Sequence, residues 1–343
     1  MGNPFEAIVE SLRLDHDDTG KRLDSAAITN VTLFTERELT QVRNKVFETK
    51  YPELKAMGFI PIATDIDPDL DTYSYQIQDA YGQARIINKN DGHAIPMVSL
   101  GTREETGKVV DIGLGYGYQL SELRLANKLG KPLGMRLANA ARRGHLFAID
   151  ELLRTGKLAT TGQTANGLGG FCNSADVNTL SSGLTFTAWM SQGSTPDAID
   201  IYNDLCRMYQ SVSDATDSLY NVDTFLFAAK LYGVISNMPM FETGSETTVL
   251  QYFLRNHPGV SAASWGALNG TGDGTIGTSG YHQIIAYQRS ADCLEGVVPL
   301  EFEQITPQAN GFKVSVPCRS RCGGVKWYIP ASARYGFVNH STT

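Results

Sequence analysis

The chain has 343 residues, of which 42% are hydrophobic and 19% are charged, and its formal net charge at pH 7 is −7. This composition excludes a chain that is disordered throughout, and the length predicts two domains or one large domain with extensions. The acidic balance excludes an overall attraction to a phosphate backbone, although an acidic protein can still enclose DNA without gripping it.

Residues 1–60 are predicted to form an N-terminal arm with a short amphipathic helix near its start and a longer one over residues 35–51. In the longer helix, Thr35 and Glu38 have the spacing of a capping box, and Pro52 ends the helix. The arm has too few apolar residues to fold alone, so we expect it to pack on something else. The apolar residues that define the two helices are Ala7, Ile8, Leu12 and Leu14, and then Leu39, Val42, Val46 and Phe47.

Residues 61–118 are predicted to form a β-ribbon and its flanking strands. The sequence DTYSYQIQDAYGQARIIN alternates and then breaks at Tyr81-Gly82, which predicts two strands with a turn. Further strands are predicted at IPMVSL and at GKVVDIGLGYGYQL, with the charged sequence GTREETG, residues 101–107, at a tip between them. A charged tip on a two-stranded ribbon has no core of its own to pack against, so we expect it either to be flexible or to contact a neighbouring molecule.

Two helices follow in residues 121–156. The first begins at a Ser121 cap and stops at Gly130, and the second runs from Pro132 to Gly156. At 1.5 Å per residue the second helix is roughly 35 Å long. Its predicted apolar stripe consists of Leu133, Leu137, Ala140, Ala141, Phe147, Ala148 and Leu152.

Residues 157–194 are rich in Gly, Asn, Ser and Thr, which predicts a long loop at a domain junction. Residues 195–290 are predicted to form a second unit of α/β character. Its helices are capped by Thr195 and Ser245. Its strands lie in DTFLFAAKLYGVI, which is buried, and in SGYHQIIAYQR.

Residues 291–343 return to β structure. The sequences VVPLEFEQI, GFKVSVPCRS and GGVKWYIPAS each have the character of a strand. No repeat of fixed period is visible along the chain, so we expect neither a solenoid nor a propeller.

The cysteines indicate reduced thiols of a cytosolic protein, since their number is odd and most are far apart in sequence. The first residues are acidic and lack a long apolar run, so they do not resemble a signal peptide. No window approaches 18 uncharged apolar residues, and we expect no transmembrane helix. The five cysteines are Cys172, Cys206, Cys293, Cys318 and Cys322.

The glycines of VVDIGLGYGY, at positions 113, 115 and 117, invite comparison with a dinucleotide-binding turn. That fingerprint requires G-x-G-x-x-G leading directly into a helix, whereas the spacing here is G-x-G-x-G. A bent strand in which each glycine relieves crowding is the better interpretation. No cofactor is predicted.

Two further motifs, for calcium binding and for a zinc protease, also lack required residues. The sequence TDIDPDLD, with aspartates at 65, 67, 69 and 71, resembles a calcium loop but lacks its glycine and its terminal glutamate. A solvated acidic turn explains it better. His145 lies near Asp150 and Glu151 without forming an H-E-x-x-H motif. The sequence therefore predicts no catalytic residue and no metal site.

Cys318 and Cys322 have C-x₃-C spacing but lack the second pair of ligands that a structural zinc site needs. Unlinked thiols are favoured over a metal site or a disulfide. Arg319 and Arg321 share one face of a strand and, with Lys326 on the next strand, form either a basic patch for a phosphate or carboxylate partner or ordinary solvated strand residues.

Four stretches together resemble the major capsid proteins of tailed phages with the Hong Kong 97-type fold, in a branch formerly catalogued as a family of unknown function. They span roughly residues 60–180 and 290–340, and residues between match only in layout. In chain order they are DTYSYQIQDAYGQARIINKNDGHAIPMVSL, GYGYQLSELRLANKLGKPLGMRLANAARRGHLFAIDELLRTGK, GLGGFCN and VPCRSRCGGVKWYIPASARYG.

The resemblance implies an α+β capsid fold. Residues 1–60 would be the N-terminal arm, 61–118 the extended loop with its flanking strands, and 195–290 the axial domain. Residues 119–194, with the long spine helix, and 291–343, with the closing strands, would form the peripheral domain. The arm and ribbon would then lie on neighbouring subunits.

The implied function is a non-enzymatic shell protein that self-assembles, as hexamers and pentamers, into the icosahedral head around the double-stranded DNA of a tailed phage. Portal, scaffolding or decoration proteins would be partners, and assembly would take place in the host cytoplasm without a membrane. An encapsulin-like compartment and a soluble α/β nucleotide-binding enzyme are the alternatives. The predicted intersubunit contacts are Arg103, Glu104, Glu105, Lys108, Arg319 and Arg321.

Overall fold

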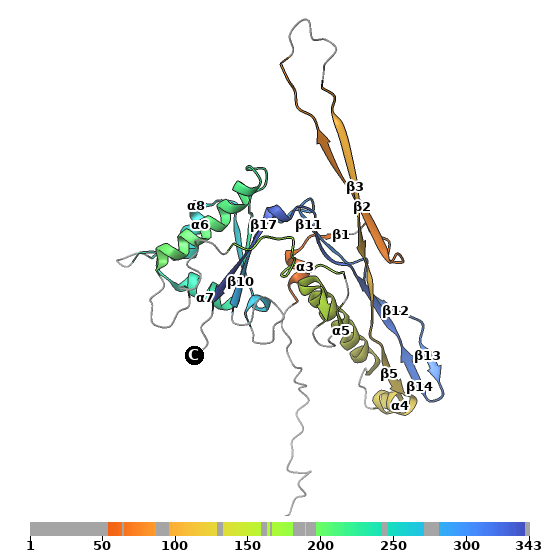
Figure 1. The fold of residues 1–343 in the computed structure, drawn as a ribbon. Coiled ribbons are helices and arrows are strands. Elements are labelled where there is room, and N and C mark those ends of the chain that lie inside the picture. The colour runs from red at the N-terminus through yellow and green to blue at the C-terminus, as the bar shows by residue number, and fades with distance from the viewer. Residues whose placement is uncertain are drawn as a thin grey trace, which may run out of the picture. The chain divides into compact units, whose positions relative to one another are not determined.

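The computed structural model describes residues 54–63, 65–86, 96–128, 133–158, 163–164, 167–180, 189, 197–241, 246–270 and 281–339 (Figure 1). The helices predicted in the arm lie outside these ranges, as do the predicted helix-boundary residues Gly130, Pro132, Thr195 and Ser245.

Helices and strands are mixed along the described chain. The helices are α3 (Ala56–Phe59), α4 (Leu120–Lys128), α5 (Leu133–Thr155), α6 (Ala198–Ala215), α7 (Ala229–Asn237) and α8 (Val249–Asn256), with short 3-10 turns at Gly266–Leu268 and Pro330–Ser332. The strands are β1 (Ile62–Ala63), β2 (Thr72–Tyr81), β3 (Ser99–Lys108), β4 (Val110–Gly113), β5 (Tyr116–Gln119), β6 (Lys157–Leu158), β7 (Gln163–Thr164), β8 (Thr224–Ala228), β9 (Ser261–Trp265), β10 (Tyr281–Tyr287), β11 (Leu294–Val297), β12 (Leu300–Gln304), β13 (Gln308–Asn310), β14 (Lys313–Val316), β15 (Cys318–Cys322), β16 (Gly324–Trp327) and β17 (Ala333–Asn339).

The strands pair into small sheets that join distant parts of the sequence. The largest has the order β17-β10-β8-β9, in which β8 and β9 are parallel and the other pairs are antiparallel. The closing strands pair with strands on both sides of the ribbon in sequence: with β4 and β5, which follow it, in the sheets β12-β15-β4 and β13-β14-β5, and with β1, which precedes it, in the sheet β1-β11-β16. Among the described strands, β2 and β3 pair only with each other, as a two-stranded ribbon.

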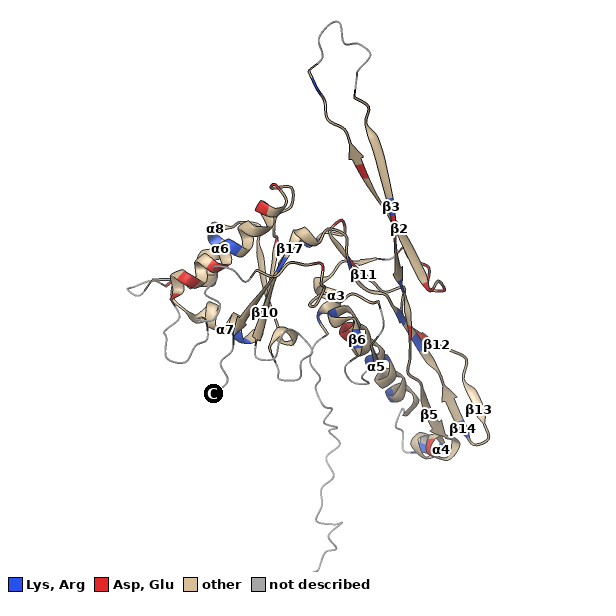
Figure 2. Ribbon diagram, viewed as in Figure 1, with Lys and Arg blue, Asp and Glu red and all other residues tan. Residues whose placement is uncertain are grey.

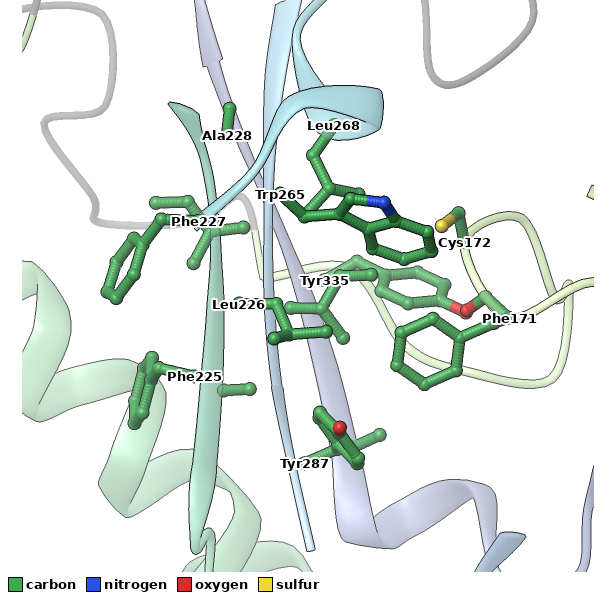
Figure 3. Packing of buried hydrophobic residues seen from close by; sticks show 14 of the residues in the cluster. Phe171, Cys172, Phe225, Leu226, Phe227, Ala228, Trp265, Leu268, Tyr287 and Tyr335 are labelled. Carbon is green, nitrogen blue, oxygen red and sulfur yellow. The ribbon is translucent and has the colours of Figure 1, made fainter. Parts of the chain in front are cut away.

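The four-stranded sheet is covered on both faces, which explains why every residue of β8 is buried. Figure 3 shows Phe225 and Phe227 on one side of β8 and Leu226 on the other. The Phe225 ring packs against Phe253 of α8, with 5.3 Å between ring centroids. Alternation along a strand places successive side chains on opposite faces, so an uninterrupted apolar run fits a strand buried on both sides.

Helix α5 runs between the predicted ends, since it begins just after Pro132 and ends just before Gly156, whose φ of 68° is left-handed. The face that it buries matches the predicted stripe only in part: Ala141 and Leu152 are buried as predicted, but other positions differ. Phe147 is 49% exposed, whereas Ile149 and Leu153 are fully buried. The helix lies along β15, β12 and β16, so its buried face is set by the position of those strands.

Three further local predictions require correction. The apolar run after Ala228 is not a continued strand but helix α7. Helix α6 is capped by Asp197, whose carboxylate accepts a hydrogen bond from the backbone of Ile199. Helix α8 is capped by Thr248 in a capping box with Gln251. In both helices a second polar residue a few positions beyond the predicted cap has the required extended backbone.

Candidate assembly surface on the ribbon

The charged sequence GTREETG lies within strand β3 rather than at a tip between strands, which corrects the sequence-based prediction. Its residues pair with the first ribbon strand, so that Glu105 lies opposite Tyr75 and Arg103 lies opposite Ile77. The first strand ends at Tyr81 as predicted, but its partner begins at Ser99. Deleting residues 101–107 would therefore remove most of β3.

Tyrosine rings cover the two glycines of GTREETG, Gly101 and Gly107. A Cβ atom at Gly107 would lie 2.2 Å from the Tyr73 ring, and one at Gly101 would lie 3.0 Å from the Tyr81 ring. Tyr73 is the cross-strand partner of Gly107. Glycine inside a strand weakens it, and an aromatic ring that covers the glycine from the neighbouring strand protects the backbone there, so the tyrosine rings offset the cost of the two glycines.

The base of the ribbon is attached to the subunit by a cluster of polar and aromatic side chains. Lys326 of β16 forms an ion pair with Glu105 of β3, with 2.9 Å between Nζ and Oε2. The hydroxyl of Tyr75 donates a hydrogen bond to the same carboxylate. The Tyr75 ring packs edge-on against Tyr328, with centroids 4.9 Å apart, and the Tyr328 hydroxyl donates to Glu295 at 3.0 Å. We call these five residues the ribbon-base cluster.

The ionisation of the ribbon-base cluster favours the charged pair at neutral pH. The hydrogen bonds from Tyr75 and Lys326 lower the pKa of Glu105. Burial lowers the pKa of Lys326, but its contacts with Tyr75 and Glu105 outweigh burial and raise the pKa to about 12. Burial and the Glu105 carboxylate raise the pKa of Tyr75, so its hydroxyl stays protonated and donates.

The predicted contact residues of the ribbon have unequal positions. Glu105 turns toward its own subunit, whereas Glu104 and Lys108 are exposed on the opposite face of β3. The guanidinium of Arg103 pairs with Glu105 at 2.7 Å, and its side chain remains 71% exposed. Of the four, Glu105 is the one that the structure assigns to an internal role.

Arg321, one of the predicted intersubunit contacts, is buried in its own subunit, with 3% of its side chain exposed. Its guanidinium pairs with Asp71, lies 2.8 Å from an oxygen of Asp111, and donates to the carbonyl oxygen of Pro68 at 2.7 Å. This arginine therefore holds the acidic turn that precedes the ribbon.

Arg319 supports the same turn from a more exposed position. It binds Glu303 at 2.7 Å and Asp69 at 3.2 Å, and 38% of its side chain is exposed. The acidic turn is solvated as predicted, since the side chains of Asp69 and Asp71 are 78% and 85% exposed, and it also has arginine partners on β15, about 250 residues further along the chain. A group of four aspartates in sequence did not reveal those partners.

Exposed apolar residues gather at the other end of the ribbon, and sequence reasoning missed them. Large apolar side chains normally avoid such exposure in clusters, and a cluster of this kind marks an interaction surface. A usable signal was present, because the sequence IPMVSL is apolar and was predicted as a strand of a two-stranded ribbon, which has no core to cover it. They are Tyr81 (62% exposed) on one face of the ribbon, Val98 (71%) and Leu100 (72%) on the other face, and Ile86 (99%) and Met97 (85%) outside the paired strands, and we call these five residues together the distal ribbon patch.

The remaining candidate chemistry has structural explanations. Gly115 lies between β4 and β5, where a Cβ atom would approach the carbonyl oxygen of Val316 to 2.9 Å, so the glycine-rich stretch is a bent strand rather than a turn that enters a helix. Cys318 and Cys322 are the two ends of β15 and lie about 13 Å apart at the usual rise of a strand, beyond disulfide reach. Both thiols are buried and unlinked.

His145 connects the long helix to the sheet beneath it. Its Nε2 donates to the carbonyl oxygen of Leu114 at 2.9 Å, since a carbonyl can only accept, and its Nδ1 lies 2.8 Å from the hydroxyl of Ser320. The ring is fully buried. In the described ranges no three His, Cys, Asp or Glu residues are grouped as a metal site would require.

None of the helices in the described part of the chain has both the length and the hydropathy needed to cross a membrane.

Comparison with solved structures shows a shared fold with phage proteins. The capsid of Myoviridae phage XM1 matches with a TM-score of 0.73 and 17% identity, over 89% of this chain and 98% of that one. A chain of Gordonia phage Cozz matches with a TM-score of 0.58 and 16% identity, over 96% and 98%. The capsid of a native GTA particle matches with a TM-score of 0.57 and 10% identity, over 93% and 100%.

No curated protein matches the chain in sequence. A family model described as "Major capsid protein" matches residues 82–336, which is most of the chain. This match covers the second half of the ribbon, the long helix, the four-stranded sheet and the closing strands. The chain therefore belongs to the major capsid protein family.

Proposed function

We propose that this capsid subunit assembles with copies of itself, as hexamers and pentamers, into an icosahedral phage head that encloses double-stranded DNA. The observation that carries the proposal is the distal ribbon patch, because its side chains have no cover among the described residues of their own subunit. Burial of these five side chains against neighbouring subunits would contribute several kcal/mol to each interface between subunits. Contacts of this kind, repeated around a shell, stabilise it even where each interface is modest.

The ribbon-base cluster supports the same proposal from the other end. An extended two-stranded ribbon is marginally stable by itself, and its direction is defined only where it is anchored. Lys326 and Tyr328 anchor it to β16 and the segment that follows. The base thus sets the direction in which the ribbon presents the distal ribbon patch to the next subunit. The exposed polar contacts with that subunit are Arg103, Glu104 and Lys108 of β3.

Within the subunit, we assign residues 195–290 to an axial domain, and residues 119–194 and 291–343 to a peripheral domain with α5 as its long helix. Residues 61–118 form the extended loop with its flanking strands, and residues 1–60 form the arm. Portal, scaffolding or decoration proteins are the further partners, the virion is the location of the assembled protein, and assembly takes place in the host cytoplasm. The subunit acts as a structural protein without a catalytic role.

Electron microscopy of the purified full-length protein tests the proposal. We expect closed particles of uniform diameter, and particles purified from infected cells should contain DNA. A protein that remains monomeric over the concentrations and salts that favour capsid assembly would contradict the proposal. Particles filled with a protein cargo instead of DNA would favour the encapsulin-like alternative.

A further inference from the structure

The charges of the subunit are unevenly distributed, and helices α4 and α5 carry a local excess of positive charge. Residues 120–149 contain six lysines and arginines and one acidic residue, a net charge of +5, so the rest of the chain carries −12. Figure 2 shows lysine and arginine along α4 and α5 and acidic residues at the end of α5 near α3. The exposed members are Arg124, Lys128, Arg136, Arg142 and Arg143, and we call them the basic helix face.

Four of the five cations of the basic helix face have no carboxylate partner in the described part of the chain. Among the described residues, no ion pair joins a carboxylate to Arg124, Lys128, Arg136 or Arg142. The one acidic residue of the segment, Glu122, accepts a hydrogen bond from the backbone of Gln119 at 3.1 Å, at the start of α4. Exposed cations that lack acidic neighbours create a positive potential that attracts a polyanion.

The large exposed apolar side chains on these helices are Leu125 of α4 (58% exposed) and Met135 and Phe147 of α5. Met135 (67% exposed) and Phe147 (49%) lie twelve residues apart, which places them about 120° apart around α5. The face between them carries Arg136 and Arg143, seven residues or about 10 Å apart. A protein interface usually has an apolar centre, whereas nucleic acid is bound mainly through its phosphates.

We propose that the basic helix face binds the phosphate backbone of double-stranded DNA. The inference rests on the proposed function, because it names the part of the shell subunit that touches the enclosed genome. Arginine suits this role, since its guanidinium donates two parallel hydrogen bonds to a phosphate. The contact is independent of sequence, and the acidic remainder of the subunit confines it to one band, so the DNA stays free to enter and leave.

Binding of a short labelled DNA duplex to the unassembled full-length subunit tests this inference. The variant Arg136→Gln/Arg142→Gln/Arg143→Gln removes three charges from exposed positions of α5, and glutamine keeps the helix propensity. We expect it to lower affinity about tenfold at low salt and to reduce the slope of log affinity against log salt by about 2 to 3, since each lost phosphate contact removes about 0.9. Circular dichroism checks that the helix is retained.

The matched control is Lys230→Gln/Arg255→Gln/Lys313→Gln, which removes the same charge from exposed positions outside α4 and α5. We expect it to retain most of the affinity and the salt slope. An equal loss in the control, or no loss in the α5 variant, would overturn the inference. Tighter binding to a polyglutamate peptide of the same charge than to DNA would also overturn it, in favour of an acidic protein partner.

The test separates this inference from the proposed function. Wild-type protein that forms closed shells but shows no salt-dependent DNA binding as a subunit overturns the inference alone. Wild-type protein that binds DNA through α5 but forms no shells overturns the proposed function and leaves the phosphate contact in place.

Discussion

Lys326 Nζ lies 2.9 Å from Glu105 Oε2, and this ion pair joins strand β16 of the subunit to strand β3 of the ribbon. The lysine also lies over the Tyr75 ring, 5.4 Å from its centroid. Because Tyr75 and Glu105 belong to opposite strands of the ribbon, one side chain anchors both strands. The ribbon-base cluster is therefore the place where a single substitution should loosen the ribbon without unfolding the subunit.

Substitution of Lys326 by Gln should increase hydrogen exchange of the backbone amides in β2 and β3 near the ribbon base. The expected loss of stability is small, about 0.5 to 1 kcal/mol, because both partners are partly exposed to solvent. Arg103→Gln is the control, since its ion pair with Glu105 is at an exposed position and does not reach β16. Equal exchange rates in the two variants would contradict the anchoring role.

The stabilising effect of Glu105 should depend on pH. Its pKa is lowered from 4.5 in the folded protein, so its contribution is present above about pH 4.5 and is lost as the pH falls through the folded pKa. Lys326 has a pKa raised from 10.5 to about 12, so its contribution is present below about pH 10.5 and is lost as the pH rises through about 12.

Urea unfolding of wild type and Glu105→Gln between pH 3 and pH 8 measures this dependence. Wild type should be more stable at pH 6 to 8, and the difference should disappear toward pH 3, where the carboxylate of the wild type is protonated. A difference that is constant across this range would show that the carboxylate charge is not the cause.

Substitution of the distal ribbon patch should block assembly and leave the fold intact. Val98→Lys/Leu100→Lys places charges at two positions that are 71% and 72% exposed in the subunit. Exposed substitutions change folding stability by about 0.5 kcal/mol or less, whereas a buried unpaired charge in an interface is strongly unfavourable. Leu219→Lys, at a position 73% exposed on another part of the subunit, is the control.

Particle yield by sedimentation and thermal unfolding of the subunit together report the result. We expect the ribbon variant to melt like wild type and to form few closed shells. A normal yield of shells from Val98→Lys/Leu100→Lys would remove the patch from the assembly contacts.

Replacement of His145 by Phe should destabilise the subunit by about 2 to 4 kcal/mol, because it leaves the Leu114 carbonyl and the Ser320 hydroxyl without their buried partner. Urea unfolding measures this loss. Ser320→Ala should cost about 1 kcal/mol, since the imidazole keeps its bond to Leu114. An effect of His145→Phe below that of Ser320→Ala would argue against a bridging role for the ring.

The thiols should react in an order set by burial. Cys322 is fully buried, and burial raises its pKa to about 12, so both access and thiolate content are low at pH 8. Cys206 is the least buried of the five and should be the first to react with a thiol reagent. Chelator and mild reductant should leave the melting temperature unchanged. Rapid modification of Cys322 in the folded protein would contradict this order. A lower melting temperature with chelator or reductant would contradict the assignment of these cysteines as unlinked thiols.

Local sequence rules predicted some elements well for identifiable reasons. Pro132 and Gly156 mark the ends of α5 because the first is suited to a helix start and the second takes a left-handed backbone. The alternation in residues 72–81 predicted β2, and the closing strands followed the apolar pattern of the last fifty residues. These features depend on neighbouring residues alone.

The sequence by itself determined where most helices and strands form and, through the order of its motifs, the capsid family to which the chain belongs. Only the tertiary structure decided which faces are buried and which charges are paired. Arg321 and Asp71 are 250 residues apart, and the partner of Gly107 is the ring of Tyr73. Helix and strand periodicity comes from the local backbone, whereas burial and ion pairing depend on which distant segment packs there, and that information is absent from any single window of sequence.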